Sequence, residues 1–449
     1  MMLGKKLKSA VWLVAGVLIG SLGTVVSTAS QAAQRVTVSA GVREAPPYEG
    51  FFIDPDTGLR VWRLGGSQQE MGSRLAYPDG NEALGILHGQ HFYSKTSPVN
   101  QDETLVLGSG GQNQPHAALW SLKQHRLIAW VPGPRQEANI QQRQLLWDRH
   151  DPLVYWFAEG NRLMRARIEP QTFIVTAEVW DRFPEYRYVT FGYGEGNFSD
   201  DGRRIVLMGP AQESGFIFML PYEVEQKKVL PRRQLTSATQ PEVDWAGVDP
   251  TGQYILFDQS VPDRRTVVVR FDQAAVDSPR LIYEHAKHSD FVIDHQGDVW
   301  IVYGNWLGLF ASRLSDGTDR KVWPADNGDD NPFSVSGHVA RVAGQPGMVL
   351  VSRNVDGGLY LVDIDQPEKV RYVGNSRQGR KPEQAKETDA DWGVDSEGEV
   401  TFYKREPRGA ISRSGKYVFF TGDYQFYLRS GYDSEPEPCR AYLNMIEVE

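Results

Sequence analysis

A short unit recurs seven times along most of this sequence, and it restricts the possible fold more than any other feature. Each copy contains a turn rich in Asp, Ser, Asn or Gly, followed by a strand-length run of β-branched and aromatic residues. The copies are roughly 45–50 residues apart, except before the last one, where residues 375–400 intervene. The turns lie at 97–103, 147–152, 197–202, 247–252, 291–297, 341–347 and 410–415, and the runs at 104–107, 153–157, 204–208, 254–257, 299–302, 348–351 and 417–420.

This period is typical of propeller blades, so the sequence predicts an all-β, seven-bladed β-propeller. A single blade cannot bury its own apolar faces, and the ring must therefore close. The segment 51–58 precedes the first full copy and is expected to supply the strand that completes the last blade. The 12 Trp, 19 Tyr and 44 Gly fit strands and turns better than helices. Two β-sandwiches are the alternative architecture.

The N-terminus has the pattern of a secretory signal peptide. Lys5, Lys6 and Lys8 precede an apolar stretch at about 10–26, and small residues follow up to Ala33. Cleavage after Ala32 would leave residues 33–449 as one propeller domain, secreted or periplasmic, with no stable membrane insertion. The alternative is a retained membrane anchor, for which the run is slightly short and broken by glycine.

The net charge argues against a nucleic-acid-binding protein, and the cysteine content argues against a disulfide-stabilised fold. The net charge of −9 gives no bulk attraction to nucleic acid. The single cysteine, Cys439, excludes an intramolecular disulfide framework. In an oxidising compartment a lone thiol is expected to be buried or bound to a metal.

Residues just before the repeat turns should gather at one rim of the central channel. Four of the nine histidines fall at such positions: His91, His116, His288 and His338. For any one of them, a polar residue at a strand start is the simpler interpretation. As a set they favour a functional site.

One group of these residues could bind zinc. His288, Asp290, His338 and Cys439 come from neighbouring blades, and imidazole, carboxylate and thiolate are all zinc ligands. Four such ligands would close a structural site. The acidic stretch 326–331 could hold calcium, although such stretches are more often solvated loops.

A second group could transfer protons. His91, His116 and Tyr188 offer a base and an acid for removing the proton α to a carboxylate. That proton is acidic enough only when a cation neutralises the carboxylate, for which Arg204, Arg187 and Arg149 are the choices. Arg204 directly follows a repeat turn, so it is expected near the end of its strand that lies away from the rim with Tyr188. Substrate contacts are expected from Lys95, Arg187 and Tyr193, with aromatic packing as the alternative for the tyrosine.

Several stretches resemble propeller polysaccharide lyases, over most of the chain after residue 32. They are His91-Phe-Tyr-Ser-Lys-Thr-Ser-Pro-Val-Asn-Gln-Asp102, His288-Ser-Asp-Phe, Ser336-Gly-His-Val and Glu406-Pro-Arg-Gly-Ala-Ile-Ser-Arg-Ser-Gly415. The candidates are oligogalacturonate lyases and ulvan lyases.

The ulvan lyase resemblance implies that His91 and Tyr188 transfer protons, that His116 assists and that Arg204 meets the uronate of an anionic polysaccharide. It also implies that the zinc group is structural. Oligogalacturonate lyases instead hold a catalytic metal mainly with histidines, and the cysteine in the predicted group departs from that pattern.

The sequence is also compatible with two other function classes. The first is a non-catalytic periplasmic propeller that binds glycan or protein, because a fold does not determine a function. The second is a glycosidase with paired carboxylates, for which Glu195, Asp244 and Glu406 are present without a distinctive spacing.

Overall fold

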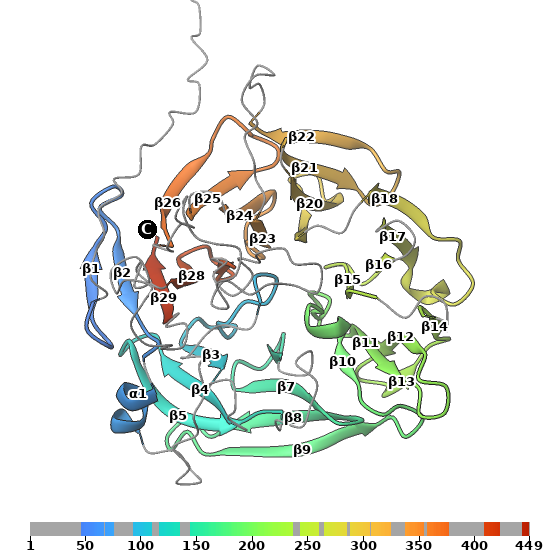
Figure 1. Cartoon of the computed structure of the whole chain (residues 1–449), viewed down its shortest axis with the longest axis horizontal. Helices are drawn as coiled ribbons and strands as arrows, with labels where there is room; N and C mark the ends of the chain where they lie inside the picture. The colour runs from blue at the N-terminus through green and yellow to red at the C-terminus, as the bar shows by residue number, and fades with distance from the viewer. Residues whose placement is uncertain are drawn as a thin grey trace, which may run out of the picture. The chain divides into compact units, whose positions relative to one another are not determined.

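The computed structural model describes residues 46–66, 68–75, 93–109, 116–134, 144–236, 243–259, 265–284, 288–305, 307–324, 337–353, 357–376, 408–422 and 442–448. Its sheets are arranged as the seven blades of a β-propeller, which confirms the predicted all-β fold class (Figure 1). The predicted signal peptide, residues 1–32, lies outside these ranges. None of the helices in the described ranges has the length and apolarity needed to span a bilayer.

Each blade is an antiparallel sheet formed by strands that follow one another along the chain. Blade 1 contains β3 (Leu105–Ser109), β4 (His116–Ser121) and β5 (Arg126–Pro132), and blade 2 contains β6 (Leu145–Trp147), β7 (Val154–Glu159), β8 (Arg162–Ile168) and β9 (Val175–Arg182). Blade 3 contains β10 (Thr190–Phe191), β11 (Arg204–Pro210), β12 (Ile217–Glu223), β13 (Lys228–Val229) and β14 (Arg233–Gln234). Blade 4 contains β15 (Ala246–Val248), β16 (Tyr254–Gln259), β17 (Arg265–Arg270) and β18 (Arg280–Glu284).

The remaining blades follow the same order. Blade 5 contains β19 (Ser289–Ile293), β20 (Val299–Asn305), β21 (Gly308–Arg313) and β22 (Asp319–Trp323), and blade 6 contains β23 (Gly337–Arg341), β24 (Met348–Arg353), β25 (Gly358–Asp363) and β26 (Arg371–Asn375). Blade 7 contains β27 (Ala410–Ile411), β28 (Tyr417–Gly422) and β29 (Tyr442–Glu447), with β2 (Arg60–Arg63) and β1 (Phe51–Ile53) added at its outer edge. The short helix α1 (Gln68–Arg74) follows β2. The predicted runs lie in or overlap the second strand in blades 2 to 7 and the first strand, β3, in blade 1.

In the repeated turns, the side-chain oxygen of an early residue accepts hydrogen bonds from backbone N–H groups that follow it. In the turn of blade 5, Asp294 Oδ1 accepts the N–H groups of Gln296 and Asp298, and Asp249 and Ser412 accept N–H groups in the same way in blades 4 and 7. Gly252 and Gly297 have a positive φ, which these turns require. The repeat visible in the sequence is therefore one local hydrogen-bonding pattern, used again in successive blades.

The ring closes in blade 7 between strands from the two ends of the propeller. Residues 60–63 of β2 pair antiparallel with residues 444–447 of β29, and β1 pairs with β2 on its outer side. The prediction that the segment 51–58 completes the last blade is thus confirmed for β1, while the strand in direct contact with β29 comes a few residues later.

The apolar core lies between neighbouring blades. Among the described residues, each seam between two blades has its own cluster of buried apolar side chains; in the seam between blades 7 and 1, Trp120 packs with Phe419 and Leu443. Trp120 Nε1 also donates a hydrogen bond to the carbonyl oxygen of Leu64, 2.9 Å away. Each fully buried side chain of this size contributes about 1.5–3 kcal/mol.

All innermost strands run in the same direction, so the ring has two distinct faces. We call the face that carries the seven repeat turns the turn face. The opposite face, where the chain comes into each innermost strand, is the loop face. Residues of different blades can meet only at one of these faces or in the channel that joins them.

Candidate functional site

A short segment of blade 1, residues 93–97, lies in the channel and contacts five other blades. We call it the crossing segment. Tyr93 contacts blades 5 and 6, and Lys95 contacts blades 3 and 4. Thr96 Oγ1 accepts a hydrogen bond from Gln144 Nε2, at the start of blade 2, over 2.6 Å. The crossing segment therefore divides the channel into a loop-face part and a turn-face part.

The loop-face part contains a compact group of one phenol and two imidazoles. The hydroxyl of Tyr93 lies 2.7 Å from Nδ1 of His288. The rings of His288 and His338 stack with their centroids 3.9 Å apart, and Tyr93 meets His338 edge-on at 5.3 Å. Tyr93 and His338 are buried, while His288 is half-buried. A phenol and an imidazole at hydrogen-bond distance can exchange a proton, which is the chemistry of an acid–base pair.

An insertion in blade 3 brings two more phenols to the loop face. The 3-10 helix η2 (Gly192–Gly194) interrupts the innermost strand between Phe191 and Phe198, and Gly192, Tyr193 and Gly194 all have a positive φ. A Cβ on Gly192 would lie 1.7 Å from the carbonyl oxygen of Ala246, so only glycine fits. The insertion places the hydroxyl of Tyr193 3.5 Å from that of Tyr188.

Of these two predicted site residues, Tyr193 has a pKa raised by its surroundings. Burial raises the pKa of Tyr193, and its contact with the Tyr188 hydroxyl raises it further. At neutral pH Tyr193 is therefore a proton or hydrogen-bond donor rather than a phenolate. The loop face thus holds Tyr188 and Tyr193 on blade 3, and Tyr93 with His288 and His338 on the crossing segment and blades 5 and 6.

Lys95, predicted to bind substrate, is buried in the channel and fully engaged. Its Nζ lies 2.8 Å from Oε2 of Glu195 and 3.5 Å from the ring centroid of Trp245. Only 8% of the residue is exposed. Its charge holds the crossing segment against blades 3 and 4, and nothing in these contacts presents it to a ligand on the loop face.

The other predicted catalytic residues are distributed as follows. His116 begins β4 and Tyr188 precedes β10, both on the loop face as expected. Arg187, just before Tyr188, is exposed, and its Nη2 donates to the carbonyl oxygen of Gln212 over 3.4 Å. His91 lies outside the described residues.

Arg204 is held at the turn face, away from Tyr188. Met208 of β11 pairs with Thr190, and Arg204 lies about 13 Å further along the strand, from the rise per residue of a β-strand. Its Nη1 donates to the carbonyl oxygen of Gly252 over 2.8 Å, and its Nη2 lies 3.7 Å from Glu223 Oε1. The described contacts do not bring Arg204 and Tyr188 together. Arg187 is the predicted cation that does lie at the loop face.

The predicted zinc ligands are only partly brought together. His288 and His338 are adjacent, but both carboxylate oxygens of Asp290 accept backbone N–H groups, from Phe291 and Arg341. Burial raises the pKa of Asp290 to about 6, and Arg341 acts in the opposite direction. Cys439 and the predicted calcium stretch 326–331 lie outside the described residues. The two imidazoles are placed as a shared metal ion would need, each oxygen of Asp290 already accepts one backbone N–H group, and the zinc site stays a prediction.

Within the described ranges, one other group has metal-ligand chemistry: His295, Asp363 and Asp365, whose donor atoms all lie within 4.8 Å of one another. This group joins the turn faces of blades 5 and 6. Arg320 Nη2 lies 2.7 Å from Asp365 Oδ1, and His295 Nε2 lies 3.2 Å from Asp363 Oδ2. Arg320 supplies the positive charge that an ion would otherwise bring, so the contacts describe an ion-pair network between two blades.

Comparisons with known proteins agree with the fold. No protein-family model matches the sequence, and no curated protein matches it. Among solved structures, an oligogalacturonate lyase from Vibrio parahaemolyticus is similar with a TM-score of 0.53 and 13% identity, over 89% of this chain and 96% of that chain. A hydrazine synthase from Kuenenia stuttgartiensis has a TM-score of 0.41, at 10% identity over 77% and 96% of the two chains. TolB from Acinetobacter baumannii has a TM-score of 0.34, at 13% identity over 57% and 60%. At these identities the likeness shows the propeller fold alone.

Proposed function

We propose that the protein is a polysaccharide lyase that cleaves a uronate-containing polymer by β-elimination. The observation that carries the proposal is the loop-face group, in which the Tyr93 hydroxyl lies 2.7 Å from His288 Nδ1 beside His338. A base and an acid side by side at the mouth of a channel are what proton abstraction next to a carboxylate needs. The propeller fold shared with an oligogalacturonate lyase is consistent with this function.

In the proposed reaction a base removes the proton from C5 of the uronate, the C4–O bond breaks, and an acid protonates the departing oxygen. The electrons of the C5–H bond become the C4–C5 double bond of the product, so no oxidant or water is consumed. The imidazole of His288 is the proposed base, and Tyr93 or Tyr188 is the proposed acid. Arg187, the exposed guanidinium of the loop face, is the proposed partner of the substrate carboxylate.

We further propose that the polymer is of the ulvan type. The support for this choice is the sequence resemblance, together with the tyrosines that blade 3 brings to the loop face, Tyr188 and Tyr193. In that interpretation His91 and His116 complete the acid–base set, and the protein acts in the periplasm or outside the cell. If instead a structural zinc ion is held by His288, His338 and Cys439, His288 cannot be the base, and His91 takes that role with Tyr188 as the acid.

The test is an assay of the purified protein, from residue 33 onward, with ulvan, polygalacturonate and alginate as separate substrates. The expected result is a rise in ultraviolet absorbance from the new C4–C5 double bond, greatest with ulvan. A rise with polygalacturonate alone would keep the lyase proposal and replace its substrate. Binding of these glycans without any rise in absorbance would refute the lyase proposal and favour a non-catalytic glycan-binding propeller.

The metal is tested separately, by elemental analysis of the protein before and after treatment with a chelator. The predicted site would be supported by one zinc ion per protein molecule that is lost in Cys439→Ser. A protein purified without zinc, with full lyase activity, would argue against it.

A further inference from the structure

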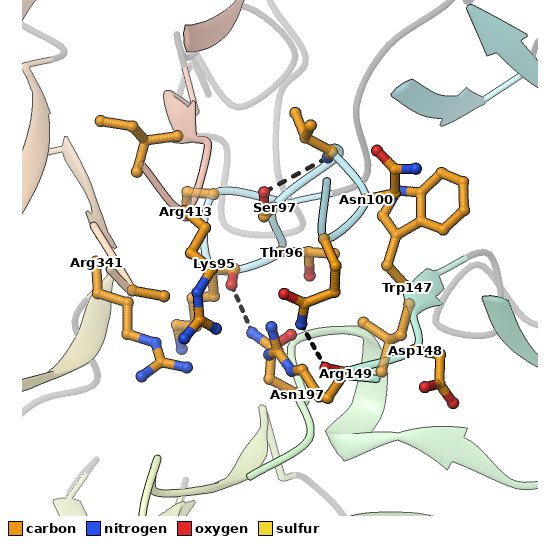
Figure 2. A pocket seen from close by; sticks show the side chains of 16 residues that line it. Lys95, Thr96, Ser97, Asn100, Trp147, Asp148, Arg149, Asn197, Arg341 and Arg413 are labelled. Carbon is orange, nitrogen blue, oxygen red and sulfur yellow. Dashed lines mark hydrogen bonds between the residues drawn. The ribbon is translucent and has the colours of Figure 1, made fainter. Parts of the chain in front are cut away.

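The turn-face end of the channel forms a cavity, on the other side of the crossing segment from Tyr93 and His288. It has an empty volume of about 610 Å³, including space open to solvent. Arg149 of blade 2, Arg341 of blade 6 and Arg413 of blade 7 line it (Figure 2). Figure 2 shows these three side chains turned toward the same space, with Asn197 and the crossing segment beside them.

Only one of the three arginines around this cavity is in a direct ion pair within the described part of the chain. Arg341 forms a two-point ion pair with Asp200, with Nη1 3.0 Å from Oδ2. No carboxylate of the described residues lies within ion-pair distance of Arg149 or Arg413. Asp148, which also lines the cavity, uses its oxygens to accept N–H groups of His150, Asp151 and Trp156. Arg149 and Arg413 therefore make no direct ion pair among the described contacts, and Asp200 acts on both of them only electrostatically.

Arg149 has donors that the protein itself does not satisfy. Its Nε is buried and has no hydrogen-bond partner, and its Nη2 makes only a long contact of 3.4 Å with the carbonyl oxygen of Phe198. Burial and then the neighbouring Arg341 lower the pKa of Arg149 to about 10, although Asp200 and Asp290 act in the opposite direction. A buried guanidinium normally has hydrogen-bond acceptors for its donors, and an anion would supply them.

From this geometry we infer that the turn-face cavity is a binding site for a dianionic oxyanion, phosphate or sulfate, held by Arg149, Arg341 and Arg413. Two guanidinium groups without a direct ion pair can both donate hydrogen bonds to the oxygens of one anion. Planar, multi-donor arginines suit a tetrahedral oxyanion, which offers several acceptor oxygens. The ligand is either the free ion or the same group as an ester on a larger molecule.

Such an anion would join blades that are distant along the chain. Arg149 lies in the turn of blade 2, Arg341 at the end of β23, and Arg413 in the turn of blade 7, the blade in which the ring closes. Because a ligand that binds only the closed ring stabilises it, binding should raise the temperature of unfolding. This inference does not depend on the lyase proposal, since its readout is binding.

The experiment titrates inorganic sulfate and inorganic phosphate into the protein by calorimetry, in a chloride buffer of constant ionic strength. Glucose 6-sulfate and glucose 6-phosphate form two further arms, which distinguish the free ion from its ester. Arg413→Gln is the main variant, because this side chain is exposed and should not be needed for folding. Arg270→Gln, an exposed arginine on blade 4, is the matched control.

We expect saturable binding with one site, weakened about 10-fold or more in Arg413→Gln and unchanged in Arg270→Gln. The melting temperature of the unchanged protein should rise by about 1–3 °C at saturating anion, relative to Arg413→Gln in the same salt. Equal affinity in both variants, or a rise in melting temperature shared by all of them, would overturn the proposal, because sulfate and phosphate stabilise proteins generally. Arg149→Gln, checked for folding by circular dichroism, should give the same loss of binding.

Discussion

The two ends of the channel differ in the chemistry they carry and in how the chain builds it. At the turn face the charged groups Arg149, Asp200 and Arg413 belong to the repeated turns themselves, so the turns of blades 2, 3 and 7 each place one charged side chain there. At the loop face the important groups come from departures from the repeat, namely the crossing segment and the insertion of blade 3. The repeated strands and turns therefore position the residues at both ends of the channel. Among the described residues, the acid–base groups contributed by irregular segments lie at the loop face.

The largest expected effect concerns the acid–base group. His288→Ala should reduce turnover of the polysaccharide by about 10²- to 10⁴-fold, because it removes one partner of the Tyr93 contact. The control is His150→Ala, an exposed histidine of the turn face whose Nε2 lies 2.8 Å from the carbonyl oxygen of Asp201. It should keep nearly full activity. Comparable losses in the two variants would show that the faces do not differ in function.

The second prediction concerns the boundary between the two ends. Lys95→Met leaves the Glu195 carboxylate in the channel without its partner and should lower the free energy of unfolding by about 3–5 kcal/mol. The double variant Lys95→Met with Glu195→Gln should recover part of that loss. Urea denaturation of the three proteins measures both effects. No recovery in the double variant would mean that packing of the lysine, not its charge, holds the crossing segment.

The third prediction concerns the turn face and its response to pH. Burial would raise the pKa of Asp200, but Arg341 and, to a lesser extent, Arg149 and Arg413 lower it below the ordinary value of 3.8. The charged carboxylate therefore stabilises the fold above about pH 4, and this contribution is lost as the pH falls through the folded-state pKa. Asp200→Asn should cost about 2 kcal/mol at pH 7, with a smaller difference from the unchanged protein near pH 3.

Thermal or urea unfolding at pH 7, 5, 4 and 3 measures this dependence. Asp272→Asn, an exposed carboxylate on blade 4, is the control and should give no comparable pH-dependent difference. A constant difference between Asp200→Asn and the unchanged protein down to pH 3 would contradict the stated role of the ion pair.

Much of the fold could be predicted because its information is local. The side chain of Asp294 and the positive φ of Gly297 act within one turn, so each repeat is readable from a few residues. The turn-face position of Arg204 could be predicted for the same reason, because this residue comes directly after a repeat turn. The seven turns, their strands and the closing of the ring by the N-terminal strands all follow from such short patterns.

The site was less predictable because its contacts are separated by long stretches of chain. Tyr93 and His288 are 195 positions apart, and Lys95 and Glu195 are 100 apart. The sequence placed His288 and His338 at one rim, which the structure confirms, but it did not indicate that Tyr93 crosses the channel to meet them. Nor did it indicate that Arg149 would face Arg341 and Arg413, because no local pattern marks a missing counter-ion.

The pairing of β2 with β29 has a consequence for how the molecule is assembled. Most strand pairs join neighbours in the chain, whereas Arg60 and Glu447, which meet in this last sheet, are 387 positions apart. Bringing together such distant partners has a large conformational-entropy cost, which is repaid only when all seven seams are filled. We therefore expect the hairpins of single blades to form early and the ring to close late, after β29 has become available to pair with β2.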